Sequence, residues 1–408
     1  MADAGRGASS SRIPVVALAA LLLATAAKLL LATRTYGTND VRAFWYFLQE
    51  YRGSGAELLY RKEAEFNHPP FVLHWLGALR WLGIATGLQP WVLVRLPSIL
   101  ADIGSFWLVA RLARPAWPAL LVLVALAPVS ILISGFHGNN DPVMIFFVLL
   151  SIFLLERGGP AWPAGVAMGM AVNFKVVPLV FWPAIFLWMP AWRRRLEYFG
   201  AAVLVVLAAS TPIVFQEPAL VAHKVLGYPS SFGIWGLSRI WPSDELESHG
   251  RLLLVAVLLG LSFWMNLRRE RPSLYRQIGV LAFAFLAVTP GFGVQYLAWL
   301  VPWIAAAGAD AGLWAASAWT ATSGGFLVLV YTYWCQGTRM EQGDANWLGA
   351  NFWQRGLPWS YADANTMCAW WGSIVPVEIA CWISVVLVLA VLARRCRDEY
   401  TSPSQVRA

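Results

Sequence analysis

Long apolar segments recur from one end of this chain to the other, and they constrain its fold more than any other feature. A helix needs roughly 17–25 mostly apolar residues to cross the hydrocarbon core of a bilayer. Only 13% of the 408 residues are charged and 59% are hydrophobic, which leaves too little charged surface for a soluble protein of this length. The sequence therefore predicts an all-α polytopic membrane protein with about 12 transmembrane helices. The candidate spans are residues 14–33, 91–110, 117–135, 142–155, 161–173, 176–190, 198–215, 251–267, 277–290, 294–307, 311–332 and 373–393.

The net charge of +8 is concentrated in short segments between apolar runs, as orientation signals are, and it does not indicate a nucleic-acid partner. If the N-terminus is cytoplasmic, the loops on the cytoplasmic side hold the arginines, whereas the outer loops around 136–141 and 290–293 contain no Lys or Arg. These arginines are Arg111, Arg114, Arg157, Arg193, Arg194, Arg195, Arg268, Arg269, Arg271, Arg276, Arg394, Arg395 and Arg397. We expect a multi-pass protein of a bacterial inner or plasma membrane, with its polar chemistry on the external, periplasmic face.

The apolar stretch 69–86 does not fit this alternation, because a full crossing there would reverse every later loop. His74 and Arg80 interrupt it, so we interpret it as a helix lying in the outer leaflet. Residues 34–90 then form one long external loop, in which the amphipathic run 43–51 is a second interfacial helix. The long segments 216–250 and 333–372 fall on the same face. Loops of this length are more often functional than not.

Five polar clusters also fall on that face: 37–42 with Asp40 and Arg42, 67–70 with His68, 136–142 with Asp141, 173–175 with Lys175, and 290–296. Each has a simpler interpretation. Asp141 before Pro142 suits a helix N-cap, His68 suits an ordinary interfacial histidine, and the Lys175 side chain could extend to the interface. However, ionisable groups within spans are functional suspects, and independent anchors have no reason to share one face.

These residue types suit acid–base and phosphate chemistry. A carboxylate such as Asp40 can act as general base on an acceptor hydroxyl. Cations such as Lys175, Arg42, Arg61 or Lys62 can neutralise a phosphate leaving group where water is scarce. A sugar carried on a lipid phosphate is such a substrate, with its tail in the bilayer and its head at the surface. Five external tryptophans could pack against sugar rings or form an interfacial aromatic belt: Trp235, Trp241, Trp347, Trp353 and Trp359.

The arrangement resembles the GT-C superfamily of multi-spanning glycosyltransferases, which use polyprenyl- or dolichyl-phosphate-linked sugars. Thr38-Asn39-Asp40 resembles their acidic residue after the first span. His68-Pro69-Pro70-Phe71 and Val94-Arg95-Leu96-Pro97-Ser98 resemble segments of protein O-mannosyltransferases and aminoarabinose transferases. Gly138-Asn139-Asn140-Asp141 lies where the oligosaccharyltransferase catalytic subunit has a second acidic motif. Asn173 to Pro178 is similar to a Lys-x-x-Pro segment of mannosyltransferases in this superfamily.

The resemblance implies a site and a mechanism. Asp40 and Asp141 would be the catalytic carboxylates. Asp40 would deprotonate the acceptor hydroxyl, and Asp141 would assist in positioning. Lys175, His68 and Arg42 would bind the donor phosphate. Asn140, Gln295 and Tyr296 would contact substrate. The sugar is most often mannose in the nearest relatives, and the acceptor could be a glycan, a lipid or a protein.

The resemblance also implies a domain organisation and bears on metals. Residues 1–215 would form the shared module with the catalytic loop 34–90, and residues 216–408 a variable transmembrane module. Each acidic motif has one carboxylate rather than an Asp-x-Asp pair, whereas hard cations want several carboxylate oxygens. We therefore expect no cofactor and no metal, although a divalent ion is possible.

Two other functions stay open. A transporter or flippase would also be polytopic with intramembrane charge, but no internal repeat is evident. A surface-polysaccharide polymerase or ligase would use similar donors without needing Asp40. Cys335 and Cys368 bracket the last external loop and either pair as a disulfide or remain thiols.

Overall fold

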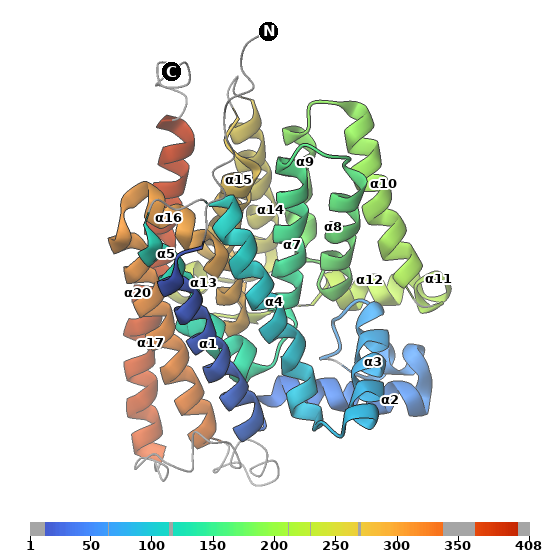
Figure 1. The fold of residues 1–408 in the computed structure, drawn as a ribbon. Helices are drawn as coiled ribbons and strands as arrows, with labels where there is room; N and C mark the ends of the chain where they lie inside the picture. The colour runs from blue at the N-terminus through green and yellow to red at the C-terminus, as the bar shows by residue number, and fades with distance from the viewer. Residues whose placement is uncertain are drawn as a thin grey trace.

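The protein is almost entirely helical, as the computed structural model shows (Figure 1). The structure describes residues 13–63, 65–113, 117–210, 212–228, 230–267, 271–337 and 364–398. The first-half elements are α1 Val15–Arg34, α2 Asn39–Lys62, α3 Phe71–Thr86, α4 Pro90–Leu112, α5 Pro118–Ala125, α6 Pro128–Leu132, η1 Ile133–His137, α7 Asp141–Glu156, α8 Trp162–Phe174, η2 Val177–Phe181, α9 Trp182–Trp188 and α10 Trp192–Ala209. The second-half elements are α11 Ile213–Gln216, α12 Pro218–Leu226, β1 Ser231–Phe232, α13 Gly236–Ile240, α14 Asp244–Asn266, α15 Leu274–Val288, β2 Gly291–Phe292, η3 Val294–Trp303, α16 Ile304–Ala311, α17 Leu313–Gly337 and α20 Ala364–Asp398.

Six helical segments of the described residues are long and apolar enough to cross a membrane. They are Val15–Arg34, Pro90–Leu112, Pro118–His137, Asp244–Asn266, Leu313–Trp334 and Gly372–Arg397. Every predicted span overlaps helical residues, but the count of about 12 is not confirmed. The others are short: α7 has 16 residues, about 24 Å of helix, against a hydrocarbon core of about 30 Å. Much of α7 and α15 is buried against neighbouring helices, so they complete the interior of the bundle.

The bundle has two chemically different ends. At one end, which we call the arginine end, Arg276 and Arg395 both pair with Asp310, and Arg271 donates to the carbonyls of Leu187 and Trp188. The other end, the loop end, is where α1 finishes and α4 begins. Helices α7 and α15 each connect the two ends. Arg271, Arg276 and Arg395 are among the arginines that the sequence predicts to be cytoplasmic, whereas Arg61 and Arg251 lie at the loop end.

The segment between α1 and α4 starts and finishes at the loop end. It contains the two predicted helices: α2 lies across the lower end of the upright helices in Figure 1, and α3 stands beside α4. Helix α2 bends at Gly55, whose φ of 81° is in the left-handed region. Helix α3 has 16 residues and is followed by the turn that leads into α4, so the segment ends at the same end of the bundle at which it starts.

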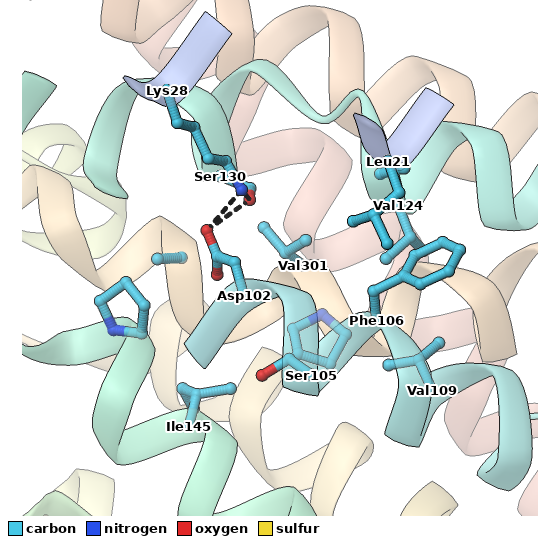
Figure 2. Close-up of a pocket in the computed structure, with 14 residues that line it drawn as sticks. Leu21, Lys28, Asp102, Ser105, Phe106, Val109, Val124, Ser130, Ile145 and Val301 are labelled. Atoms are coloured by element: carbon cyan, nitrogen blue, oxygen red, sulfur yellow. Dashed lines mark hydrogen bonds and ion pairs between the residues drawn. The ribbon is translucent and has the colours of Figure 1, made fainter. Parts of the chain in front are cut away.

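A buried charge cluster holds α1 against α4 and α6. The Lys28 ammonium donates to Asp102 and to Ser130, both at 2.7 Å, and the Ser130 hydroxyl also donates to Asp102 at 2.8 Å (Figure 2). Ser134 donates to the same carboxylate oxygen. Because each charge has its partner inside the bundle, the cluster is tolerated among apolar neighbours and fixes how α1 lies on α4.

The second half of the chain closes the loop end. The segment after α12 pairs β1 with β2 in a two-stranded antiparallel ladder, and Trp235 stacks on Phe292 with ring centroids 4.1 Å apart. Arg239 of α13 pairs with Glu378 of α20, which is 2% exposed. The predicted loops were too long in this half: 216–250 contains α12, α13 and the start of α14, whereas α17 continues to Gly337 and α20 begins at Ala364. The side chains of Cys335 and Cys368 lie outside the described residues, so their pairing stays a prediction.

The placement of α3 gives a test of topology. Single cysteines introduced at Lys62 and Leu88 flank α3 and are both exposed. Both should react with a membrane-impermeant maleimide added from the same side, because the segment begins and ends at the loop end. Labelling of position 62 from outside and of position 88 only from the cytoplasm would show that α3 crosses the membrane.

Candidate active site

A cavity of about 650 Å³ opens at the loop end of the bundle. Segments from both halves of the sequence line it, including α2, the turn before α3, Lys175 and η2 after α8, and the starts of α14 and η3. Its polar lining is Asn39, Asp40, Glu65, Asn67, His68, Asn139, Lys175, Tyr228, Ser230, Glu247, Arg251, Thr289, Gln295 and Tyr296. Asp40 and Lys175, which sequence reasoning placed on the same face, therefore border one space.

Asp40 lies in the first turn of α2, where the Thr38 hydroxyl caps the helix by accepting from the Asp40 amide at 3.3 Å. Asn139 Nδ2 donates to Asp40 Oδ2 at 2.7 Å, and His137 Nε2 lies 3.0 Å from the same oxygen. Within the described part of the chain, no hydrogen bond reaches Oδ1. Protein surrounds the side chain, yet 37% of its surface is accessible because it borders the cavity.

The turn after α1, which leads to Asp40, contacts the turn after η1, which carries Asn139. This contact depends on two glycines. Gly138 has φ 80° and Gly37 has φ 89°, and both backbones pack on Val41. A Cβ atom at Gly138 would lie 2.2 Å from Val41 Cγ2, and one at Gly37 would lie 2.7 Å from it. Any larger residue would separate the turn after α1 from the turn after η1. The glycines thus allow Asp40 to reach His137.

Arg95 joins the backbones that carry both loops. Its guanidinium is fully buried and donates to the Ala32 carbonyl at 2.8 Å and to the Thr35 hydroxyl at 2.8 Å, both at the end of α1. It also donates to the Gly135 carbonyl of η1 at 3.0 Å. One turn later on α4, Ser98 donates to the Asn139 carbonyl at 2.6 Å. The Arg-Leu-Pro-Ser motif therefore positions the site without entering it.

The electrostatics of this loop favour an ionised Asp40. Burial raises the pKa of the Asp40 carboxyl, but the adjoining His137 side chain, the hydrogen bond from Asn139 and the charge of Lys175 outweigh it, and the pKa falls to about 2. Asp40 is therefore a carboxylate at neutral pH. With Oδ2 occupied, it presents Oδ1 as its accepting oxygen.

Lys175 follows α8 directly and forms an ion pair with Asp141. Its ammonium lies 3.0 Å from both carboxylate oxygens, and Trp299 Nε1 also donates to Asp141 Oδ1. The ammonium is 5.1 Å from the ring centroid of Tyr296 and 5.6 Å from that of Trp299. Asp141 has no exposed surface and does not line the cavity, so it holds Lys175 from behind while Lys175 faces the space.

His68 also lines the cavity but adds no positive charge at neutral pH. Burial, assisted by the Lys175 charge, lowers the pKa of the His68 imidazole to about 4. The ring packs on Phe44 at 5.1 Å between centroids, and its Nδ1 atom has no hydrogen-bond partner within the described residues. This nitrogen is itself buried, so His68 borders the cavity without presenting Nδ1 to it.

Other predicted site residues divide between the cavity and its surroundings. Gln295 and Tyr296 line the cavity, and the Tyr296 hydroxyl lies 2.7 Å from Ser230 Oγ. Asn140 is buried and its carbonyl starts α7, away from the cavity lining. Arg42 is exposed on α2 and does not line the cavity either. Arg61 pairs with Glu57 and Glu217 at the surface.

Several residues near the site escaped sequence reasoning. His137 and Asn139 belong to the same polar motif as Asp141. The sequence analysis identified this motif, so both residues could have been predicted to lie at the site. Trp299 and Tyr331 carried no signal, since an aromatic residue inside an apolar span is typical of packing. As to metals, no group of three His, Cys, Asp or Glu side chains in the described residues is arranged to hold an ion.

Comparison with known protein families gives a match to a family of glycosyltransferases. The sequence model of glycosyltransferase family 87 matches residues 66–231. The matched segment contains His68, Arg95, Asp141 and Lys175, and it begins after Asp40. No curated protein matches the chain. The predicted resemblance is confirmed, and the match favours a glycosyltransferase over a transporter or flippase.

The Lys175–Asp141 pair yields a stability prediction. Lys175→Met should lower the free energy of unfolding by about 3–5 kcal/mol, because it leaves the fully buried Asp141 charge without its cation. Lys175→Met combined with Asp141→Asn should recover most of this loss, since no uncompensated charge remains. Thermal unfolding of the purified variants in detergent measures both effects. Equal stability of the single variant and the wild type would show that the pair contributes nothing to folding.

Proposed function

We propose that this membrane glycosyltransferase transfers a sugar, with mannose as the first candidate, from a polyprenyl-phosphate donor to an acceptor hydroxyl on the external face. The observation that carries the proposal is that the Asp40 carboxylate and the Lys175 ammonium line one cavity at the loop end of the bundle. The reaction needs an accepting oxygen on the side of the attacking hydroxyl and a cation on the side of the departing phosphate.

The cavity suits a lipid-linked donor. Beyond Lys175, its wall is apolar along Val176, Val177, Leu179 and Val180, and Val255 of α14 faces them with 49% of its surface exposed. A prenyl chain can lie along this wall while its phosphate meets Lys175. His68 would border the phosphate as a neutral group, without adding positive charge. Arg42 lies away from the lining, so we assign it no contact with the phosphate.

The charge of the cavity favours a single phosphate. Asp141 already neutralises the Lys175 ammonium, and Glu65 and Glu247 also border the space, against one further cation, Arg251. A phosphodiester carries one negative charge, whereas a pyrophosphate carries more and would meet more repulsion here. The polyprenyl monophosphate is therefore the better donor. Because the described residues hold no group of three His, Cys, Asp or Glu side chains arranged around an ion, we propose that the reaction proceeds without a metal.

The proposed step is one displacement with inversion at the anomeric carbon. Asp40 Oδ1 accepts the hydrogen bond of the acceptor hydroxyl and takes its proton as the new glycosidic bond forms. A base whose pKa is about 2 takes this proton late, when the hydroxyl oxygen is already bonded to the sugar. Asp141 acts by positioning Lys175. Gln295, Tyr296 and Tyr228 border the space where sugar rings would lie, whereas Asn140 does not.

The acceptor class is tested in the same assay. The full chain is purified and given a labelled polyprenyl-phosphate mannose together with a glycan, a lipid or a peptide bearing a free hydroxyl. Transfer to one of these identifies the acceptor. Formation of a polymer from a polyprenyl-pyrophosphate oligosaccharide, with no transfer from the monophosphate donor, would instead indicate a polysaccharide polymerase or ligase.

Donor affinity tests the role of Lys175. The double variant Lys175→Met/Asp141→Asn should bind the donor about 10- to 100-fold more weakly than the wild type, because one charge-assisted contact is worth about 1.5–3 kcal/mol. The double variant is preferred because it leaves no uncompensated buried charge. Binding is measured by titration with polyprenyl-phosphate mannose. Unchanged affinity would mean that Lys175 serves only to stabilise the bundle.

Asp40→Asn should lower kcat by about 100-fold or more with little change in stability or donor affinity. Asparagine keeps the size and one accepting oxygen but takes no proton at useful pH, and it caps a helix nearly as well as aspartate. Asp40→Asn should therefore remain folded. Glu65→Gln, which also removes a cavity carboxylate, is the matched control and should retain transfer. Near-wild-type turnover by Asp40→Asn would remove the catalytic assignment.

A further inference from the structure

His137 is a buried titratable group at the site for which the proposed reaction has no role so far. It ends η1, and only 3% of its side chain is exposed. Both ring nitrogens are engaged: Nε2 lies 3.0 Å from Asp40 Oδ2, and Nδ1 lies 2.9 Å from the Tyr331 hydroxyl. The His137 carbonyl also accepts from the Thr38 hydroxyl at 2.9 Å. The residue thus touches the turn that carries Asp40 through its side chain and its backbone.

The chemistry of the partners decides which nitrogen carries hydrogen. An ionised carboxylate only accepts, so His137 Nε2 must donate to Asp40. In the neutral ring, Nδ1 is then the acceptor, and the fully buried Tyr331 hydroxyl can donate to it. This tautomer gives both ring nitrogens of His137 a suitable partner, Tyr331 at Nδ1 and Asp40 Oδ2 at Nε2. The opposite tautomer would place the Nε2 lone pair against the carboxylate.

We propose that His137, held in this tautomer by Tyr331, is a positioning residue that fixes Asp40 with Oδ1 toward the acceptor hydroxyl. The inference rests on the proposed function, in which Asp40 takes the acceptor proton. In that step the acceptor O–H bond breaks and its proton moves to Oδ1. The acceptor oxygen bonds to the anomeric carbon, and the bond from that carbon to the phosphate oxygen breaks with its electron pair. His137 keeps its own proton throughout.

Two donors on one oxygen explain how the carboxylate is oriented. His137 and Asn139 approach Oδ2 from residues that flank Gly138, so a single rigid turn supplies both. A carboxylate held by one donor can still rotate, whereas two donors fix its plane. Orientation of a reacting group before the reaction is a large part of catalysis, and small misplacements are costly. His137 therefore acts through Asp40 and contacts no substrate itself.

Other groups also face Asp40 and contribute to its titration. Lys175 comes from the segment after α8, His68 from the turn before α3, and Tyr228 from the segment after α12. Of these, Lys175 favours the ionised form of Asp40. Loss of His137 would leave burial opposed only by Asn139 and Lys175, so the pKa of Asp40 would rise.

Three variants of the full chain test the proposal. His137→Leu removes the donor with similar volume, His137→Gln keeps an N–H near the position of Nε2, and Tyr331→Phe removes only the hydroxyl that fixes the tautomer. His74→Gln, at an exposed histidine of α3, is the matched control. For each we would measure kcat and KM with polyprenyl-phosphate mannose, and kcat as a function of pH.

His137→Leu should lower kcat by about 100-fold with KM little changed. On acidification, this variant should lose its activity at a higher pH than the wild type does. The sign follows from the raised pKa, since protonated Asp40 cannot accept the acceptor proton. His137→Gln should recover most of the activity. Tyr331→Phe should give a smaller loss with the same direction of shift, and His74→Gln none.

A purely structural role would reduce the yield of folded protein but leave kcat and the pH profile of the folded fraction unchanged. That result for His137→Leu overturns the proposal, as does a His137→Gln variant that is as inactive as His137→Leu. Where His137→Leu does not fold, an unshifted pH profile in Tyr331→Phe overturns it. Wild-type protein that transfers no sugar from the donor would overturn the proposed function and this inference together. If the wild type transfers sugar and only the variants lose activity, the result concerns the role of His137 and leaves the proposed function intact.

Discussion

The site depends on one buried guanidinium. The last carbonyls of α1 have no partners within the helix, and at the edge of a bilayer few water molecules can replace them. Arg95 donates to these carbonyls and to the Gly135 carbonyl of η1, so it joins the two turns that lead to Asp40 and to His137. Because carbonyl dipoles surround the guanidinium, no carboxylate is needed, and no anion competes with the site. Removing Arg95 would orphan several carbonyls at about 1–3 kcal/mol each.

Pairing of charges distinguishes structural from functional polar groups in this bundle. Lys28 meets Asp102, Arg239 meets Glu378 and Arg276 meets Asp310, and each pair lies between helices with little exposed surface. Such pairs fix packing and offer nothing to a ligand. In the described part of the chain, Asp40 borders the cavity and its Oδ1 atom receives no hydrogen bond. A substrate would supply this missing partner.

The sequence was sufficient for the helices, the two-ended polarity of the bundle and the convergence of Asp40, His68 and Lys175, because apolar runs and arginine placement determine these locally. It was insufficient for the count of spans, since buried helices such as α8 are short and still apolar. The sequence was also insufficient to predict which side chains contact one another when they lie far apart along the chain. His137 and Tyr331 are separated by 194 residues, and no local pattern indicates that α17 packs on η1. Arg42 shows the opposite error: its charge suited the site, but its position on α2 directs it elsewhere.

The two acidic residues to which the sequence analysis gave different roles also differ in what surrounds them. Asp40 and Asp141 each follow asparagine at the start of a helix. Asp141 is fully buried with Lys175 and Trp299 on its oxygens, so it has no surface left for a substrate. Asp40 keeps both donors on one oxygen and leaves the other beside the cavity. A carboxylate can accept a proton from a substrate only where the fold leaves an oxygen accessible. In the proposed reaction, the second acidic motif therefore contributes by fixing the cation, and the first contributes the reacting oxygen.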